Sequence, residues 1–297
     1  MNIEVLVDVK TELGEGPLWD VDEQRLYWID SFGAKVFRCA PDGSEVRAWE
    51  VPEKIGSMAL RKGGGAIVSL RTGLHALDFD SGDCTPIADP EADLPSTRLN
   101  DGKVDRQGRF LVGSMDMNED DGVGALYRLD PDLSVTKLEG GIICSNGPCF
   151  SPDGRTFYFT DTWSGEISVY DYDTASGTPS NKRCFTRVKD LGAELTGQYG
   201  AYDGATVDAE GCVWTALVYA GYLLRYAPDG SLDRRIDMPV KKVTSVMFGG
   251  PDMDELYVTS MARPPLPRFP GDGPLRGSLF RITGLGIRGV PEARFAG

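Results

Sequence analysis

The sequence predicts an all-β fold, a six-bladed β-propeller with four-stranded antiparallel blades around a central channel. Two observations lead to this prediction: a segment that recurs six times, and a pattern of short strands and turns inside each repeat. Consecutive repeats start 41, 44, 46, 57 and 41 residues apart. A period of about 40 to 50 residues with four strands per unit is typical of propellers. The equivalent first residues are Glu15, Gly56, Asn100, Asn146, Asp203 and Thr244.

Each repeat begins with a short apolar strand, a turn such as 151–154 or 208–211, and a second strand rich in aromatic and β-branched residues. This order is typical of a hairpin. A third strand follows in most repeats, for example at 35–38, 125–128, 167–170 and 222–225. The apolar pattern has a period of two, which disfavours helical solenoids. We expect the strand at 3–7 to complete the last blade and close the ring.

No linker or low-complexity segment separates the repeats, so residues 1–297 are expected to form a single propeller domain. The formal net charge of −14 would repel phosphate backbones and anionic lipids, which argues against nucleic-acid and membrane partners. The first residues do not resemble a signal peptide, and no apolar run approaches the roughly 18 residues of a membrane span. The sequence therefore predicts a cytoplasmic protein. Its six cysteines lack CxxC spacing, so neither a zinc knot nor a disulfide framework is indicated.

The first strand of every propeller blade lines the channel, so equivalent first residues should converge on the axis. Two carboxylates, Glu15 and Asp203, and two amides, Asn100 and Asn146, would meet there. At any one position an Asn-Gly or Asp-Gly turn explains the residue. Four oxygen-bearing side chains at one repeat position instead favour a cation site, because converging carboxylates repel one another when no cation joins them. Such ligands suit calcium, magnesium or manganese.

The only histidine, His75, is expected on the third strand of a blade and away from the axis. A Ser-His-Asp mechanism or a histidine-rich zinc site would have to use it. The chemistry is then left to carboxylates and a metal ion.

Four segments resemble the signature segments of the gluconolactonase and regucalcin (senescence marker protein) family, with bacterial sugar lactonases nearest. They are LGEGPLWD at 13–20, RLNDGKVD at 98–105, SNGPCFSPDG at 145–154 and YDGATVDAEG at 202–211. The resemblance implies one divalent metal ion held by Glu15, Asn146 and Asp203, and a substrate bound by Arg98 and Asn100. The substrate-contacting Glu of the family falls at or beside Asn118, with Glu119 next to it, a departure from the family pattern that leaves the substrate preference open.

For an axial cation site of this kind, the resemblance implies metal-dependent hydrolysis of sugar lactones, such as glucono-, xylono- or arabinonolactone, to aldonic acids. The ion would polarise the lactone carbonyl, and Asp203 would orient or deprotonate the attacking water. A cation beside Asp203 should lower its pKa. Calcium is the first candidate, and manganese, zinc, magnesium and ferrous iron are the alternatives. The ligand oxygens should lie about 2.0 to 2.6 Å from the ion.

Two other function classes stay open at this point. One is a non-catalytic interaction propeller with a structural calcium ion. The other is a different propeller enzyme, such as a phosphotriesterase-like hydrolase with two calcium ions and a histidine dyad, or a metal-free condensing enzyme. The oligomeric state is open as well. Finally, the proline-rich segment 262–276 is expected to be an ordered flap at the channel mouth, or else a surface excursion.

Overall fold

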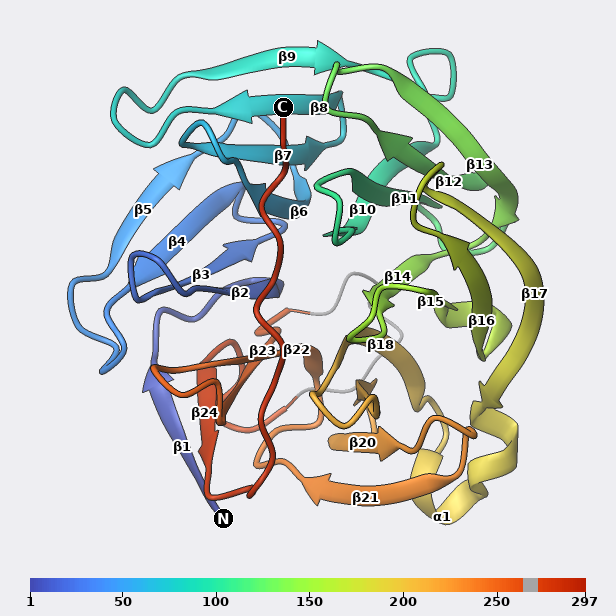
Figure 1. Cartoon of the computed structure of the whole chain (residues 1–297). Helices are drawn as coiled ribbons and strands as arrows, with labels where there is room; N and C mark the ends of the chain where they lie inside the picture. Colours follow the sequence, from blue (N-terminus) through green and yellow to red (C-terminus); the bar gives the residue numbers. More distant parts are fainter. Residues whose placement is uncertain (264–271) are drawn as a thin grey trace.

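The computed structural model describes residues 1–263 and 272–297, and it confirms the six-bladed propeller (Figure 1). Each blade is a four-stranded antiparallel sheet whose strands follow one another from the axis outward. The first three blades comprise β2 (Gly14–Asp20), β3 (Arg25–Asp30), β4 (Lys35–Cys39) and β5 (Arg47–Glu50); β6 (Ile55–Leu60), β7 (Ala66–Leu70), β8 (Gly73–Leu77) and β9 (Cys84–Ala88); and β10 (Thr97–Val104), β11 (Phe110–Asp116), β12 (Gly124–Leu129) and β13 (Val135–Ile142).

The other three blades follow the same order, and short helices occur only in connections among the described residues. These blades comprise β14 (Ser145–Phe150), β15 (Thr156–Asp161), β16 (Glu166–Asp173) and β17 (Thr178–Arg187); β18 (Ala201–Val207), β19 (Val213–Val218), β20 (Tyr222–Tyr226) and β21 (Leu232–Asp237); and β22 (Val243–Gly249), β23 (Glu255–Ser260), β24 (Leu279–Thr283) and β1 (Asn2–Val7). The helices are η1 (Thr162–Ser164), η2 (Val188–Leu191) and α1 (Ala193–Thr196).

The N-terminal strand completes the last blade, as the sequence predicts. β1 pairs antiparallel with β24, so the outermost strand of this sheet comes from the start of the chain and its other three strands come from the end. The innermost strands β2 and β22 then pack side by side. Sequence-distant strands thereby close the ring.

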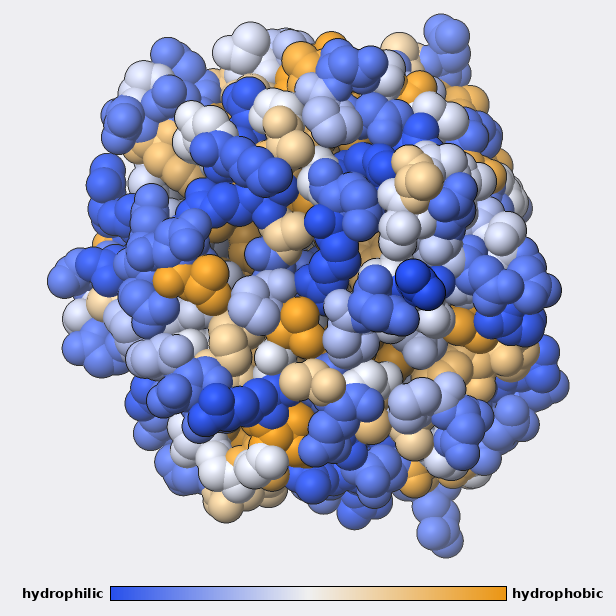
Figure 2. All heavy atoms as spheres, in the orientation of Figure 1, coloured by the Kyte–Doolittle hydropathy of each residue, from blue (hydrophilic) through white to orange (hydrophobic). Residues whose placement is uncertain are grey.

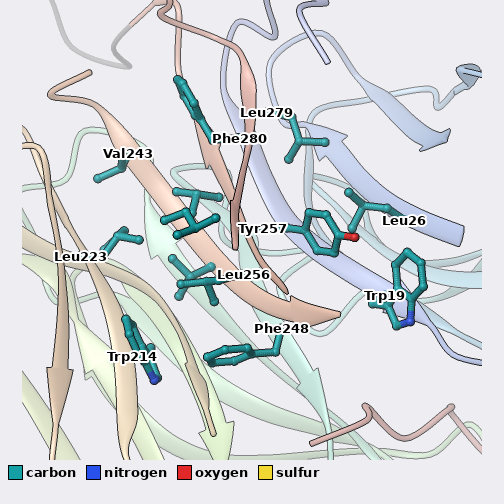
Figure 3. Packing of buried hydrophobic residues seen from close by; sticks show 14 of the residues in the cluster. Trp19, Leu26, Trp214, Leu223, Val243, Phe248, Leu256, Tyr257, Leu279 and Phe280 are labelled. Carbon is teal, nitrogen blue, oxygen red and sulfur yellow. The ribbon is translucent and has the colours of Figure 1, made fainter. Parts of the chain in front are cut away.

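Hydrophobic side chains fill the spaces between blades. In the largest cluster, Trp19 of β2 stacks on Tyr257 of β23 with ring centroids 5.8 Å apart, and Trp214 of β19 meets Phe248 of β22 edge to face at 5.7 Å (Figure 3). All four side chains are buried. Burying a large apolar side chain contributes about 1.5 to 3 kcal/mol, so these contacts hold the last blade against its two neighbours.

All six innermost strands carry a register irregularity near their first residues. A bulge of this kind bends a strand and changes the direction of the adjacent side chain. It therefore sets the direction of the residues that begin each repeat. The irregularities lie between Glu15 and Leu18, Ile55 and Ser57, Leu99 and Gly102, Asn146 and Cys149, Tyr202 and Ala205, and Val243 and Val246.

The C-terminal segment, residues 287–297, crosses the face of the propeller where the innermost strands end (Figure 1). It forms bridges from Gly289 to Asp208 and from Phe295 to Arg61, and the Phe295 side chain is fully buried. Hydrophilic side chains dominate the same face in the space-filling view (Figure 2). The segment ties blades together at the end of the channel opposite to the first residues of the repeats.

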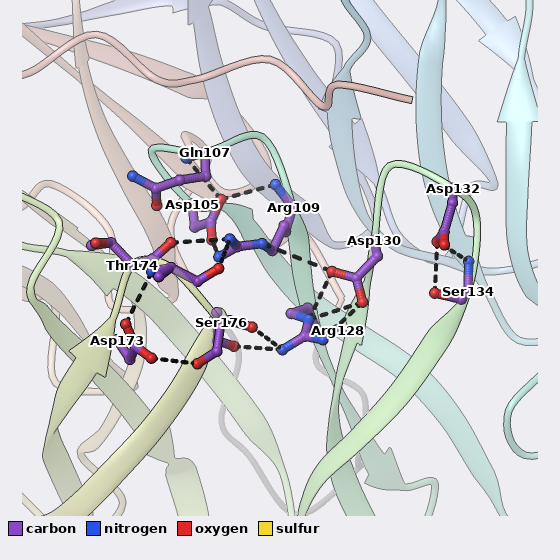
Figure 4. Close-up of polar contacts among 12 residues, drawn as sticks. Asp105, Gln107, Arg109, Arg128, Asp130, Asp132, Ser134, Asp173, Thr174 and Ser176 are labelled. Carbon is purple, nitrogen blue, oxygen red and sulfur yellow. Dashed lines mark hydrogen bonds and ion pairs between the residues drawn. The ribbon is translucent and has the colours of Figure 1, made fainter.

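Arginines also connect neighbouring blades on their outer parts. Arg109 donates to the carbonyl oxygens of Thr174 and Ala175, and Arg128 donates to those of Ser176 and Gly177 (Figure 4). Both arginines lie on the third blade and all four carbonyls lie in the β16–β17 turn of the fourth. These bonds satisfy backbone groups of a turn that has no strand partner for them.

Part of the expected flap at 262–276 lies outside the described residues, which exclude 264–271. All six cysteines are free thiols. Among the helices of the described ranges, none is long and apolar enough to cross a membrane.

Candidate functional site

The four oxygen-bearing residues at the repeat starts meet at one end of the channel. Glu15 of β2, Asn100 of β10, Asn146 of β14 and Asp203 of β18 line a single cavity of about 40 Å³, which we call the inner cavity. Arg98 lines it too. This volume has room for an ion and a water molecule. The other lining residues are Leu13, Met115, Glu119, Cys144, Thr162, Trp163, Val218, Tyr219 and Met261.

The two remaining repeat starts have structural roles. Thr244 donates a hydrogen bond of 2.5 Å from Oγ1 to the carbonyl oxygen of Gly14, which links the last blade to the first. Gly56 packs so tightly against the backbone of Asn100 that an added Cβ would lie 2.5 Å from its Cα. His75 lies on β8, the third strand of its blade, as expected, and its Nδ1 lies 3.2 Å from the carbonyl oxygen of Gly73.

The carboxylates of the inner cavity are destabilised by their surroundings. Burial raises the pKa of Glu15 well above its usual value, and the nearby charges of Asp203 and Asp101 raise it further. Burial also raises the pKa of Asp203, again with a contribution from Asp101 and one from Glu119. The protein alone thus raises the pKa of Asp203, and the lowering expected beside a cation remains a prediction for the ion-bound site. A divalent cation would relieve this repulsion, so the donor set fits one.

Asp101 is the third carboxylate near the axis, and it is engaged by the backbone. Its Oδ1 accepts from the amide of Gly102 at 2.8 Å, and its Oδ2 accepts from the amide of Gly147 at 2.9 Å. Burial nevertheless raises its pKa. Asp101 thereby joins the third and fourth blades, and it is not among the residues that line the inner cavity.

A chain of hydrogen bonds orients the amides of the site. Nδ2 of Asn146 donates to Oγ1 of Thr162 at 2.8 Å, and its Oδ1 accepts from Nδ2 of Asn100 at 3.1 Å. Oδ1 of Asn100 in turn accepts from Nη1 of Arg98 at 2.6 Å. An amide oxygen has two lone pairs, so Oδ1 of Asn146 keeps one for a cation.

Asn118, the third predicted substrate contact, is exposed in the turn after β11 and is not among the residues that line either cavity. Its neighbour Glu119 is buried and lines the site instead. Glu119 has a positive φ of 60°, and its Oε2 accepts a hydrogen bond of 2.7 Å from Nε1 of Trp163. A non-glycine residue in this conformation at a cavity is a common feature of functional sites. The signal for it in the sequence was the acidic residue immediately after Asn118.

A second cavity of about 290 Å³, the outer cavity, continues from the inner one. The two share Arg98, Met115 and Glu119, and the outer one is otherwise lined by residues that the repeat did not reveal. Its size suits a small organic molecule. These further residues are Glu12, Phe32, Lys54, Met117 and Arg263.

Another acidic group, Asp208, Glu210 and Cys212, lies at the far end of β18 and has ligand atoms close enough to hold a metal ion. Arg225 already occupies it, with ion pairs to Asp208 at 2.8 Å and to Glu210. The fully buried Asp208 also accepts from Nε1 of Trp214 at 2.8 Å. We therefore treat this group as a structural ion pair, and the inner cavity stays the candidate cation site.

The fold and the axial site define a propeller with an acidic channel, and comparison with known proteins gives its family. The family described as SMP-30/Gluconolactonase/LRE-like region matches residues 13–262, and the chain belongs to this family. Regucalcin of Xenopus laevis is 36% identical over 303 residues, which cover 100% of this chain and 99% of regucalcin. The 6-deoxy-6-sulfogluconolactonase of Pseudomonas putida is 36% identical over 287 residues, which cover 96% and 95% of the two chains.

A solved structure agrees with this assignment. The crystal structure of a calcium-binding protein, regucalcin, from Agrobacterium tumefaciens superposes with a TM-score of 0.87 and 29% identity, over 98% of this chain and 96% of the other. The family resemblance seen in four sequence segments is thus confirmed over the whole chain.

Proposed function

We propose that this protein hydrolyses sugar lactones to aldonic acids with the help of one divalent metal ion. The observation that carries the proposal is the inner cavity, where Glu15, Asn146 and Asp203 face one another beside Arg98 and Asn100. The family supports the reaction class, since one relative is a sulfogluconolactonase.

Glu15, Asn146 and Asp203 would hold the ion, and the calcium-binding relative supports calcium as the first candidate. When bound, the ion supplies electrophilic polarisation of the lactone carbonyl. Two carboxylates and a neutral amide balance a divalent charge, whereas the same carboxylates repel each other in the protein alone.

The residues of the chain would then divide the work of hydrolysis. Asp203 accepts the proton of the attacking water, because it is a carboxylate of the inner cavity that the neighbouring ion would keep ionised. Arg98 and Asn100 hold the hydroxyl or carbonyl oxygens of the sugar. Glu119, in place of Asn118, is the acidic side chain that contacts the substrate from the cavity wall.

The test is an assay of the purified protein against a panel of aldonolactones, after metal removal by chelation and after refilling with each candidate ion. Hydrolysis that is lost with the chelator and restored by one ion supports the proposal. Absence of hydrolysis with every ion and every lactone would overturn it and favour the interaction propeller.

A further inference from the structure

A lysine side chain, that of Lys54, lines the outer cavity. Lys54 lies just before β6 and lines the cavity, with its Nζ 4.6 Å from the ring centroid of Phe32. Among residues 1–263 and 272–297 its ammonium group has neither a hydrogen bond nor an ion pair. In a chain of net charge −14, a lysine without a carboxylate partner at a cavity wall is available to a ligand.

Two arginines complete the positive character of this cavity. Arg263 lies at the rim, where its backbone amide donates to the carbonyl of Glu12 at 3.0 Å and its guanidinium lies 3.6 Å from the Glu12 carboxylate. Arg98 is buried at the boundary with the inner cavity. The lining thus has three positively charged side chains and two negatively charged ones. The cations are Lys54, Arg98 and Arg263, and the carboxylates are Glu12 and Glu119.

The part of a ligand that each cation can contact depends on which cavity the cation lines. Lys54 and Arg263 line only the outer cavity, whereas Arg98 lines both. A lactone whose carbonyl lies beside Asp203 and whose carbon chain passes Arg98 enters the cavity that Lys54 lines. A cation there meets the terminal carbon and not the reacting carbonyl.

We infer that the outer cavity selects lactones with an anionic group, a sulfonate or a phosphate, on the carbon farthest from the lactone carbonyl. The inference rests on the proposed function and specifies its substrate class. Lys54 supplies the main contact, because charge-assisted hydrogen bonds to anions are stronger than those between neutral groups. Phe32 holds the ammonium by a cation–π contact. Arg263 adds charge, and Glu12 opposes binding.

The experiment compares glucono-1,5-lactone with its 6-phosphate and its 6-deoxy-6-sulfo analogue, on the metal-loaded full chain. We expect at least one anionic lactone to have the higher kcat/KM, mainly through a lower KM, and the preference to shrink with added salt. The two anionic arms distinguish a monoanionic sulfonate from a more highly charged phosphate.

Variants assign the preference to residues. Lys54→Met should lower the ratio of kcat/KM for the anionic over the neutral lactone about tenfold, and Lys54→Glu should lower it further. Glu12→Gln should raise the same ratio. Lys137→Met, which removes one positive charge from an exposed site on the outermost strand β13, should leave the ratio as it is in the wild type.

The outcomes separate the inference from the proposed function. Hydrolysis of the neutral lactone with equal or better kcat/KM than both anionic ones overturns the inference and leaves the proposed function standing. An anionic preference that Lys54→Met does not reduce also overturns it. Failure to hydrolyse any of the three lactones, with any ion, overturns both.

Discussion

Asn100 and Asn146 join two neighbouring blades at the channel axis through a hydrogen bond of 3.1 Å from Nδ2 to Oδ1. Each residue also has a second polar partner, Arg98 for Asn100 and Thr162 for Asn146. The four side chains form a line that fixes which atom of each amide is oxygen and which is nitrogen. The direction of the Asn146 oxygen therefore depends on residues that need not touch an ion.

This arrangement predicts that Thr162 controls metal affinity. Thr162→Val removes the 2.8 Å acceptor for Nδ2 of Asn146 while keeping the shape of the side chain, so the amide is held only by the bond from Asn100 and the 3.7 Å contact to Sγ of Cys144. Loss of a partner that orients a ligand weakens metal binding about 10- to 100-fold, which calorimetric titration with calcium would measure. Thr162→Ser keeps the hydroxyl and should bind nearly as the wild type does. Equal affinity of all three proteins would show that the Thr162 bond does not orient the ligand.

Arg98 should affect the substrate more than the ion. Arg98→Ala removes a buried guanidinium from the boundary of both cavities, so we expect KM to rise about tenfold or more while metal affinity stays within a few-fold. The bond from Arg98 to Oδ1 of Asn100 is lost as well, but Nδ2 of Asn100 still donates to the carbonyl oxygen of Ser145 and to Oδ1 of Asn146, so the ligand amide keeps its orientation. Arg98→Lys keeps the charge and is the matched control. Unchanged kinetics in Arg98→Ala would remove this residue from the substrate site.

The repeat made the axial residues predictable from the sequence. Because the innermost strands of the blades share one geometry, residues as distant as Glu15 and Asp203 could be assigned to one place without any contact information. The bulge at each repeat start recurs from blade to blade in the same way. The repeat could not distinguish residues of the candidate site from residues with a structural role. Thr244 lies at the same repeat position but forms a hydrogen bond between two blades.

The walls of the outer cavity were not predictable in this way. Glu12, Phe32 and Lys54 lie in connections between strands, whose conformations depend on packing and not on a period of two. Between Asn118 and Glu119 the sequence could not choose, and the structure places Glu119, with a positive φ in the turn after β11, on the cavity wall. Such a turn leaves little trace in a single sequence.

Stability should depend strongly on the buried ion pair between Arg225 and Asp208. Both residues are buried, so Arg225→Met would leave the Asp208 carboxylate without its cation. Breaking such a pair lowers the free energy of unfolding by about 3 to 5 kcal/mol. Arg235→Met on the next strand is the control, because its pair with Asp237 is exposed and contributes about 1 kcal/mol or less. Urea unfolding of both variants would test this, and equal losses would contradict it.

The carboxylates of the inner cavity should link metal binding to pH. Glu15 and Asp203 have a raised pKa in the folded protein, so between their unfolded and folded pKa values the metal-free folded state holds more protons than the unfolded state. Its stability should therefore fall as pH rises through this interval. A divalent ion binds the ionised carboxylates, so the increase in Tm that it causes should grow with pH.

Thermal unfolding from about pH 5 to about pH 8, with calcium or with chelator, measures this linkage. The variant with both Glu15→Gln and Asp203→Asn is the control, since it has neither titrating group and should show little calcium effect at any pH. A calcium effect on wild-type Tm that is the same at both ends of the range would contradict the assignment.

The assignment of Asp203 as both ligand and base makes the sharpest prediction for catalysis. Three carboxylates line the inner cavity, and of these Glu119 already accepts a hydrogen bond from Trp163, whereas Glu15 and Asp203 occupy the repeat starts. Asp203→Asn keeps the shape and one oxygen but removes the charge and the basic group. We expect kcat to fall about 100-fold or more, which is the usual contribution of a general base, and metal affinity to weaken as well. Assays at saturating ion separate the two effects, because weakened binding alone would be restored there.

Glu15→Gln is the comparison: it should weaken metal binding and regain more of its kcat when the ion is saturating. Near-normal kcat in metal-saturated Asp203→Asn would transfer the base to another group, and Glu15 would be the first to test.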